Sequence, residues 1–267
     1  MSVEQKDEKP PVGELVLSLQ FEPLSQMNSG HFGKFWQEVF PDLRCDPDSS
    51  PIDDQFEDLV GPMKFVRGFS IAPAPYPGRM VLSNKAGDRL CQIQRSRYVH
   101  NWRSAGSEYP TYSPFLTDFL DGLNKFKTFV EKNGLGSIAS NQWELVYVDV
   151  FPENEDWNSL EEWSKVLPGL FTELSVDAGL KLCNRNAAWS FDLEEVEGRM
   201  HISANLGQLP GQSSSQHSRA LLVNTTVRGP IYGWDLLELK NKFNFARQVA
   251  TGSFKKFVAP SILQRCK

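Results

Sequence analysis

Polar and aromatic side chains are most concentrated in residues 91–112, CQIQRSRYVHNWRSAGSEYPTY. Amide side chains hydrogen-bond planar partners, arginine binds carboxylate or phosphate through two parallel bonds, and Trp and Tyr supply rigid contact area. This combination is typical of a recognition surface. The candidate binding residues are Gln92, Gln94, Arg97, Asn101, Trp102, Arg103, Tyr109 and Tyr112.

A structural interpretation of the same residues stays open. In that interpretation Trp102 and Tyr109 belong to the core, Asn101 caps a turn, and Arg103 pairs with Glu108 or Asp118. A strand over 97–103 would place Tyr98, His100 and Trp102 on one face and Val99 and Asn101 on the other. On the recognition interpretation, Gln92, Gln94, Asn101, Trp102 and Arg103 gather near one pocket or interface.

The sequence lacks the familiar spacings of catalytic and metal sites. The four histidines form no HxH, HxxxH or HExxH pattern, and neither GxSxG nor GxGxxG occurs. Acidic residues follow the central strand, at Asp149, Glu153, Glu155 and Asp156, so a paired-carboxylate hydrolase is conceivable. A solvated acidic loop is the favoured interpretation of these residues. We therefore expect no metal, no cofactor and a non-enzymatic binding protein.

Length and charge narrow the class of partner. The chain has 267 residues, 40% of them hydrophobic, which is enough for a large core. Its formal net charge of −5 disfavours nucleic acid and anionic lipid as partners. We expect a protein or small-molecule partner and leave a homodimer open. The alternative function is a small-molecule enzyme or a nucleic-acid binder that uses the open face of a sheet.

The cysteines and the N-terminal residues indicate a reducing compartment. Cys45, Cys91, Cys183 and Cys266 show no CxxC and no tight pairing, as expected of free, mostly buried thiols. The first residues, MSVEQKDEKPPVG, are polar and have no apolar signal region, and no run approaches the ~20 apolar residues of a membrane span. We expect a cytoplasmic protein without membrane segments.

Hydrophobic periodicity predicts a flexible tail (1–13) and an N-terminal α+β half (14–136). Residues 14–21 alternate as a strand, 31–40 have helical spacing with Asn28 or Ser29 as cap, and 41–61 form a loop. Short strands are expected at 64–70, 79–84, 89–94 and 97–103. An amphipathic helix over 115–132 ends at NGLG.

The same order returns in a C-terminal half (137–267). A strand at 143–151 precedes a helix at 159–171 with the capping box Ser159-x-x-Glu162. A hairpin over 188–206, a Gly/Ser loop over 207–218, a strand at 220–229 and a closing helix at 235–258 follow.

We interpret this order as a diverged internal duplication in an α+β protein. Two β-α-β(3-4)-α halves, paired through an edge strand, would form one curved antiparallel sheet with long helices on one face and the other face open. This is the order of elements in TATA-binding-protein-like and helix-grip folds. A coincidental similarity of the two halves is the alternative.

Four motifs, taken in order, resemble a known family. They are ELVLSLQF near the start, QIQRSRYVHNWR with YPTY after it, WELVYVDVF at the centre, and a final helix of FxxxxxGxF character. The chain resembles the sporadically distributed bacterial "sporadTIGR" hypothetical protein family over about residues 14–265. The family has no assigned activity, so the resemblance carries over no catalytic residue. It directs attention to the candidate residues above and to Pro110, and its patchy distribution implies defence-linked or toxin–antitoxin genes. Members usually carry a Trp after the last helix, whereas this chain ends LQRCK.

Overall fold

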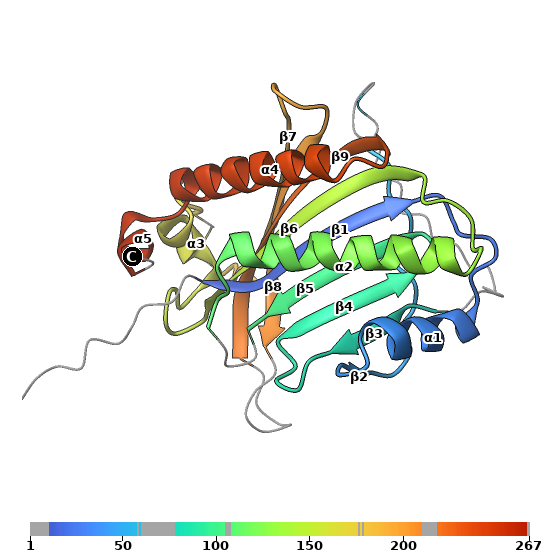
Figure 1. Ribbon diagram of the computed structural model, residues 1–267. Helices are drawn as coiled ribbons and strands as arrows, with labels where there is room; N and C mark the ends of the chain where they lie inside the picture. The colour runs from blue at the N-terminus through green and yellow to red at the C-terminus, as the bar shows by residue number, and fades with distance from the viewer. Residues whose placement is uncertain are drawn as a thin grey trace, which may run out of the picture.

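A single antiparallel sheet of nine strands organises the chain in the computed structural model (Figure 1). The structure describes residues 11–57, 59, 78–104, 108–175, 177, 179–209 and 218–265. The strand order across the sheet is β2-β3-β4-β5-β1-β6-β9-β8-β7. The strands are β1 (Val12–Phe21), β2 (Arg44–Cys45), β3 (Met80–Ser83), β4 (Arg89–Gln94), β5 (Arg97–Arg103), β6 (Ser140–Pro152), β7 (Asn186–Asp192), β8 (Arg199–Leu209) and β9 (Ser218–Gly233).

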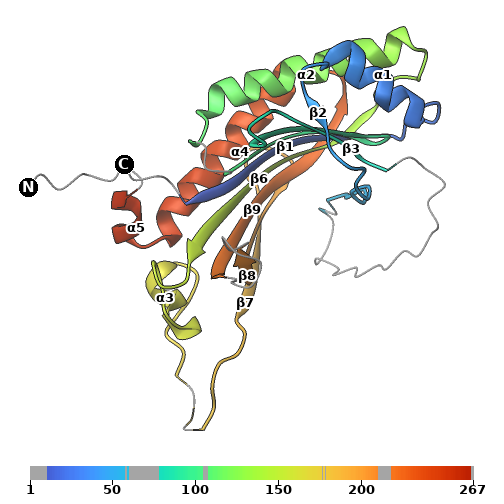
Figure 2. The ribbon, with the colours of Figure 1, turned by 90° about the horizontal axis from the view of Figure 1, so that it is seen from below.

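Helices cover one face of this curved sheet (Figure 2). They are α1 (Ser29–Val39), α2 (Tyr112–Lys132) and α4 (Leu236–Phe257), with the short α3 (Trp163–Val166) and α5 (Pro260–Arg265) near one end. Every second residue of the central strands points into this layer, because side chains of a strand alternate between its faces. Leu15, Leu17 and Leu19 of β1 are fully buried there. The core is therefore the space between sheet and helices.

Aromatic rings fill much of that space. Phe35 of α1 contacts Phe126 and Phe129 of α2 edge-on, and Phe119 of α2 contacts Phe243 of α4 in the same way. Edge-to-face ring pairs add about 1 kcal/mol beyond the area they bury. These pairs fix the three helices against one another as well as against the sheet.

Most predicted elements are confirmed. The strands expected at 14–21, 89–94, 97–103 and 143–151 are present, and both long helices lie on one sheet face. Asn28 caps α1 through its side chain. The strand expected at 64–70 lies outside the described residues.

The prediction of a continuous helix over 159–171 is wrong. A 3-10 turn (Leu160–Glu162) and the four residues of α3 replace it. The expected capping box does not form, since the Ser159 side chain makes no cap bond and Glu162 accepts from the Asn158 amide at 2.8 Å. Contacts between aromatic side chains hold this end of the fold in place. Trp157, Trp163 and Phe171 contact one another in series, and Phe171 reaches Trp189 of β7.

Strands β1 and β6 join the two parts of the chain. They pair in antiparallel register, with Val16 opposite Val146 and Leu17 opposite Leu145. β5 lies on the far side of β1, and β9 lies on the far side of β6. The polar residues of these four strands therefore form continuous rows across the middle of the sheet.

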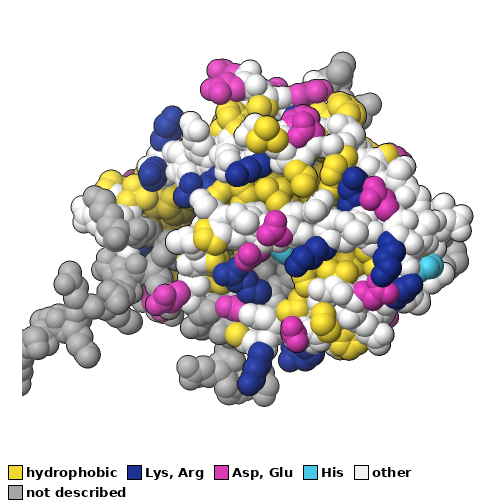
Figure 3. Space-filling model, viewed as in Figure 1, with side chains coloured by type: hydrophobic (Ala, Val, Ile, Leu, Met, Phe, Trp, Pro, Cys, Tyr) yellow, Lys and Arg dark blue, Asp and Glu magenta, His cyan; other side chains and the backbone are white. Residues whose placement is uncertain are grey.

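The helix-bearing surface mixes both signs of charge. Lys and Arg side chains alternate with Asp and Glu across it, and hydrophobic side chains show between them (Figure 3). Among the described residues, no helix has the length and apolar character needed to cross a membrane. Cys45, Cys91 and Cys183 are free thiols, of which Cys91 is buried and Cys183 exposed. Among the three cysteines that the structure describes, Cys91 meets the expectation of buried thiols, Cys45 is half-buried, and Cys183 does not meet it.

Candidate functional site

The predicted binding residues divide between the two faces of the sheet. Trp102 is 1% exposed and lies among the core residues, where its ring meets Tyr109 edge-on at 5.3 Å. The Tyr112 hydroxyl donates to the Phe243 carbonyl of α4 at 2.7 Å. Trp102, Tyr109 and Tyr112 therefore serve the core, and their expected gathering with the polar candidates at one pocket is wrong.

Arg103 shares the sheet face of Arg97 and Asn101 but bonds elsewhere. Its side chain is exposed and donates to the Gly87 carbonyl at 2.8 Å, across the turn between β3 and β4. The structural interpretation left open a pairing of Arg103 with Asp118, but Asp118 pairs with Arg89 at 3.5 Å instead.

The other four candidates do lie together, on the sheet face away from the helices. This polar face is built by alternation, since each strand that buries apolar residues under the helices turns its intervening residues the other way. Gln92 donates to Asn101, and Asn101 donates to Glu14 at 2.7 Å. The polar face presents Ser18, Gln20, Gln92, Gln94, Arg97, Asn101, Gln142, Glu144, Arg199, His201 and Arg228.

Residues 52–57, hereafter the crossing segment, run over this face and are bound mainly by their backbone. Gln94 both accepts from the Ile52 amide and donates to the Ile52 carbonyl, each at 2.8 Å. Gln20 does the same with Gln55, at 2.9 Å in both directions. A third glutamine, Gln142, accepts from the Glu57 amide at 3.1 Å.

Glu57, the last residue of the crossing segment, contacts two arginines and a histidine. Arg228 donates to the Glu57 carboxylate at 2.6 Å, Arg199 at 3.2 Å, and His201 Nε2 lies 3.0 Å from it. We call Arg199, His201 and Arg228 the cation cluster. The Glu57 side chain is only 4% exposed, so these contacts are largely shielded from water.

The cation cluster sets the charge state of Glu57. Burial raises the pKa of Glu57, but hydrogen bonds from His201 and Arg228 and the charges of both outweigh it, and the pKa falls to about 2. Ion pairs with Glu144 and Asp192 complete the cluster, to Arg228 at 3.5 Å and to Arg199 at 2.7 Å. This part of the sheet is therefore suited to hold one carboxylate in its charged form.

Arg97 is the most deeply buried cation of the polar face. Its side chain is 2% exposed, and burial lowers its pKa. It donates to Gln20, to Ser18 Oγ at 3.3 Å and to the Asp53 carbonyl at 3.3 Å, and it faces Glu144 at 3.5 Å. Arg97 therefore links the glutamines to the backbone of the crossing segment.

A hydroxyl lies within reach of the same histidine. Ser190 Oγ of β7 is 2.9 Å from His201 Nδ1, while His201 Nε2 faces Glu57. A serine, a histidine and a carboxylate in series are the components of an activated nucleophile. Two arginines also bind Glu57, so its charge is already balanced before the histidine takes up a proton.

The acidic residues after β6 do not form a carboxylate pair. Glu153 pairs with Arg219, Asp156 pairs with Arg265, and Glu155 is exposed. Asp149 is buried on the helix-bearing side, and its burial raises its pKa to about 7. The arrangement does not match the paired-carboxylate hydrolase that the sequence left conceivable.

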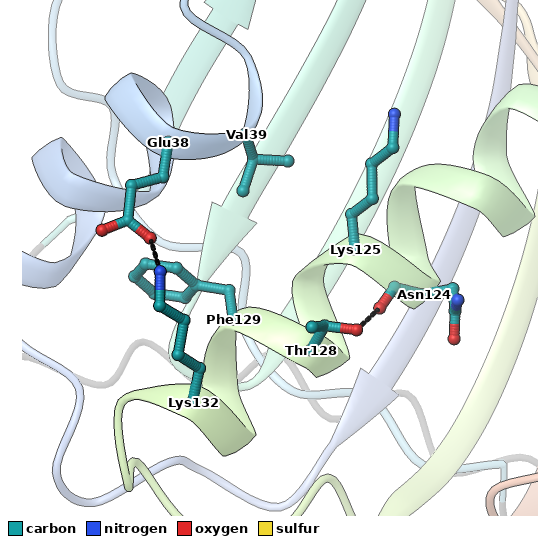
Figure 4. A pocket seen from close by; sticks show the side chains of 7 residues that line it. All are labelled: Glu38, Val39, Asn124, Lys125, Thr128, Phe129 and Lys132. Carbon is teal, nitrogen blue, oxygen red and sulfur yellow. Dashed lines mark hydrogen bonds and ion pairs between the residues drawn. The ribbon is translucent and has the colours of Figure 1, made fainter.

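A hollow of about 340 Å³ opens between α1 and α2 on the other side of the molecule (Figure 4). Its rim carries the exposed ion pair of Glu38 and Lys132, 3.0 Å apart, and Phe129 lies at its back. The Thr128 hydroxyl donates to the carbonyl of its own helix, at Asn124. Because its polar groups already pair with one another at the surface, the hollow is a weaker candidate than the polar face.

Within the part of the chain that the structure describes, no group of three or more His, Cys, Asp or Glu residues could hold a metal ion.

Sequence reasoning missed the cation cluster, Glu57, Gln20 and Gln142. The available signal was alternation, because β1 and β6 carry Ser18, Gln20, Gln142 and Glu144 at positions that alternate with buried apolar residues. No model of a known protein family and no curated protein matches this chain.

Proposed function

We propose that this chain is a non-enzymatic binding protein that takes an anionic ligand on the polar face of its sheet. The cation cluster supplies the charge, and the glutamines supply paired donors and acceptors around it. Arginine recognises carboxylates by geometry as well as charge, which makes it the common choice for such sites.

One observation carries this proposal. Arg199 and Arg228 are directly opposite in the sheet, and both donate to one shielded carboxylate. Like charges directly opposite each other destabilise a strand pair. The sheet tolerates them because an anion lies between them, and any ligand anion of similar size would serve the same purpose.

The test uses the variant Glu57→Gln, which keeps the side-chain volume and removes the charge. We expect inorganic phosphate or citrate to bind this variant saturably in isothermal titration. The double variant Glu57→Gln/Arg228→Ala should lose that binding. Asp53→Asn is the matched control, because Asp53 lies in the same segment but its side chain is exposed. Absence of saturable anion binding by Glu57→Gln would refute the proposal.

A second candidate function is favoured by the series Ser190, His201 and Glu57. In ester hydrolysis Ser190 Oγ would attack the carbonyl carbon and pass its proton to His201. The alcohol would leave with that proton, and water would then release the acid. The arginines on Glu57 weaken this candidate, since they already compensate the negative charge of its carboxylate, which therefore stabilises a protonated imidazole less. The test is hydrolysis of p-nitrophenyl acetate. If the unaltered protein hydrolyses it and Ser190→Ala does not, the hydrolase candidate is favoured. Equal rates for the two proteins would eliminate it.

We also propose an evolutionary origin and a cellular location for this chain. The matching order of elements on either side of the β1–β6 pair supports a diverged duplication, with the two halves meeting at 136–137. It also supports a likeness to TATA-binding-protein-like or helix-grip folds. Nucleic acid is a poor candidate ligand, because Glu57, Glu144 and Asp192 lie among the arginines. The free thiols of Cys45 and Cys91 support a cytoplasmic location.

A further inference from the structure

The glutamine contacts identify the chemical class of the ligand. Gln20 and Gln94 each bind the amide and the carbonyl of one residue, so they recognise backbone rather than side chain. Arg97 adds a bond to a third carbonyl of the crossing segment, that of Asp53. Any extended peptide offers these groups at the same spacing. The polar face is thus built to bind a peptide backbone largely independently of its sequence.

Recognition of side chains falls mainly on acidic residues, with one further bond from Arg228 to the Gln55 side chain. Ser96 donates to Asp54 at 2.7 Å, and the cation cluster binds Glu57. By contrast, Phe56 projects outward with 66% exposure. A peptide that supplies a carboxylate at the position of Glu57 would therefore make the principal contacts of the crossing segment, whatever lies between.

Two buried donors of the polar face, Arg97 Nε and Gln142 Nε2, have no hydrogen-bond partner among the described residues while the crossing segment is bound. Gln142 is 2% exposed. Its Oε1 accepts from the Glu57 amide, so this glutamine makes half of the paired contact that Gln20 and Gln94 make in full. A buried donor without a partner is unfavourable by about 1–3 kcal/mol. The crossing segment therefore satisfies the site incompletely, and a longer or differently placed peptide could satisfy it further.

From these contacts we infer that the polar face binds an extended acidic peptide segment of a partner protein, for which residues 52–57 are the internal stand-in. This inference rests on the proposed function and names its ligand class. The crossing segment belongs to the same polypeptide chain as the site, so its effective concentration there is roughly in the millimolar range. A partner peptide must compete with it, and weakening the crossing segment should raise the affinity for the partner.

The probe is a labelled synthetic peptide of residues 51–57, PIDDQFE, acetylated and amidated so that only its side chains carry charge. We expect the full-length Glu57→Gln variant to bind it at least tenfold more tightly than the unaltered protein in fluorescence anisotropy. Asp53→Asn should resemble the unaltered protein. The same peptide with Gln in place of its Glu should bind Glu57→Gln at least tenfold more weakly.

A second measurement needs no substitution. In the unaltered protein, saturating peptide should speed hydrogen exchange at the Ile52, Gln55 and Glu57 amides by displacing the crossing segment. Equal affinity of both peptides for Glu57→Gln, or unchanged exchange, would overturn the inference. Dimers of Glu57→Gln that form by exchange of the crossing segment, seen in sedimentation, would also overturn it in favour of a second copy. Phosphate binding without peptide binding would leave the proposed function standing and remove only this inference.

Discussion

Arg199 and Arg228 lie directly opposite each other on β8 and β9, and both donate to the same carboxylate. Two guanidinium groups in that register repel each other unless an anion separates them. The anion here is Glu57, which precedes Arg199 by more than a hundred residues in the chain. The long-range pairing explains why the crossing segment lies against the sheet, and it makes Glu57 the residue on which several predictions depend.

The first prediction concerns stability and pH. Because the pKa of Glu57 in the folded protein, about 2, is below its unfolded value of about 4.5, its charge stabilises the fold above pH 4.5. That contribution is lost as pH falls from 4.5 toward 2. Glu57→Gln should therefore lower the free energy of unfolding by about 3 kcal/mol at pH 7, and the difference should shrink toward pH 2. Urea denaturation at several pH values measures it.

Asp53→Asn is the control for this experiment. Asp53 contributes its carbonyl to Arg97 while its side chain is exposed, so the substitution should change stability by less than about 0.5 kcal/mol. A pH-independent difference between Glu57→Gln and the unaltered protein would show that the carboxylate charge does not stabilise the crossing segment.

The sequence predicted the sheet well and the site only in part, for a physical reason. Periodicity identifies which residues of a strand share a face, and it separated Asn101 from Trp102 within β5; the structure adds that Gln92, Gln94, Arg97 and Asn101 share one face of the β4–β5 hairpin. Periodicity does not say which strands become neighbours. Arg228 and Arg199 meet only because β9 pairs with β8, and Glu57 reaches them from a stretch with no periodicity at all.

Trp102 shows the opposite error. Its aromatic side chain suggested a binding anchor, but in a strand it shares a face with Tyr98 and His100, and that face is covered by α2. The alternation stated at the outset already separated Trp102 from Asn101. Residue type alone therefore misplaced it, and the period-2 argument should have taken precedence.

The second prediction concerns Asp149. Burial raises its pKa to about 7 in the folded protein, above its unfolded value of about 4, so the folded state retains a proton between those values. Stability conferred by that proton is complete below about pH 4 and is lost as pH rises through about 7. Relative to the unaltered protein, Asp149→Asn should gain stability across this window, by at most roughly 4 kcal/mol above pH 8. Thermal unfolding at pH 5 and pH 8 would measure the gain, and parallel pH profiles would contradict it.

The third prediction separates the two faces at adjacent positions. Trp102→Ala should lower the free energy of unfolding by about 3–5 kcal/mol, because it empties a fully buried site beside Tyr109. Arg103→Ala should lower it by less than about 1 kcal/mol, because Arg103 is exposed and makes one bond to Gly87. Urea denaturation compares both. Similar losses for the two variants would mean that Arg103 supports the core through the β3–β4 turn.

The last prediction tests the backbone contact of Gln94. Gln94→Ala removes both bonds to Ile52, and each such bond contributes about 1 kcal/mol net. Local opening of the crossing segment should become easier, and hydrogen exchange at the Ile52 amide should speed up by about tenfold or more. Gln92→Ala is the matched control, since Gln92 lies on the same strand and face but bonds to Asn101 instead. Faster exchange at Ile52 in Gln94→Ala alone would establish a specific contact. Equal exchange in both variants would mean that the crossing segment is held by Glu57 and the cation cluster, with no contribution from Gln94.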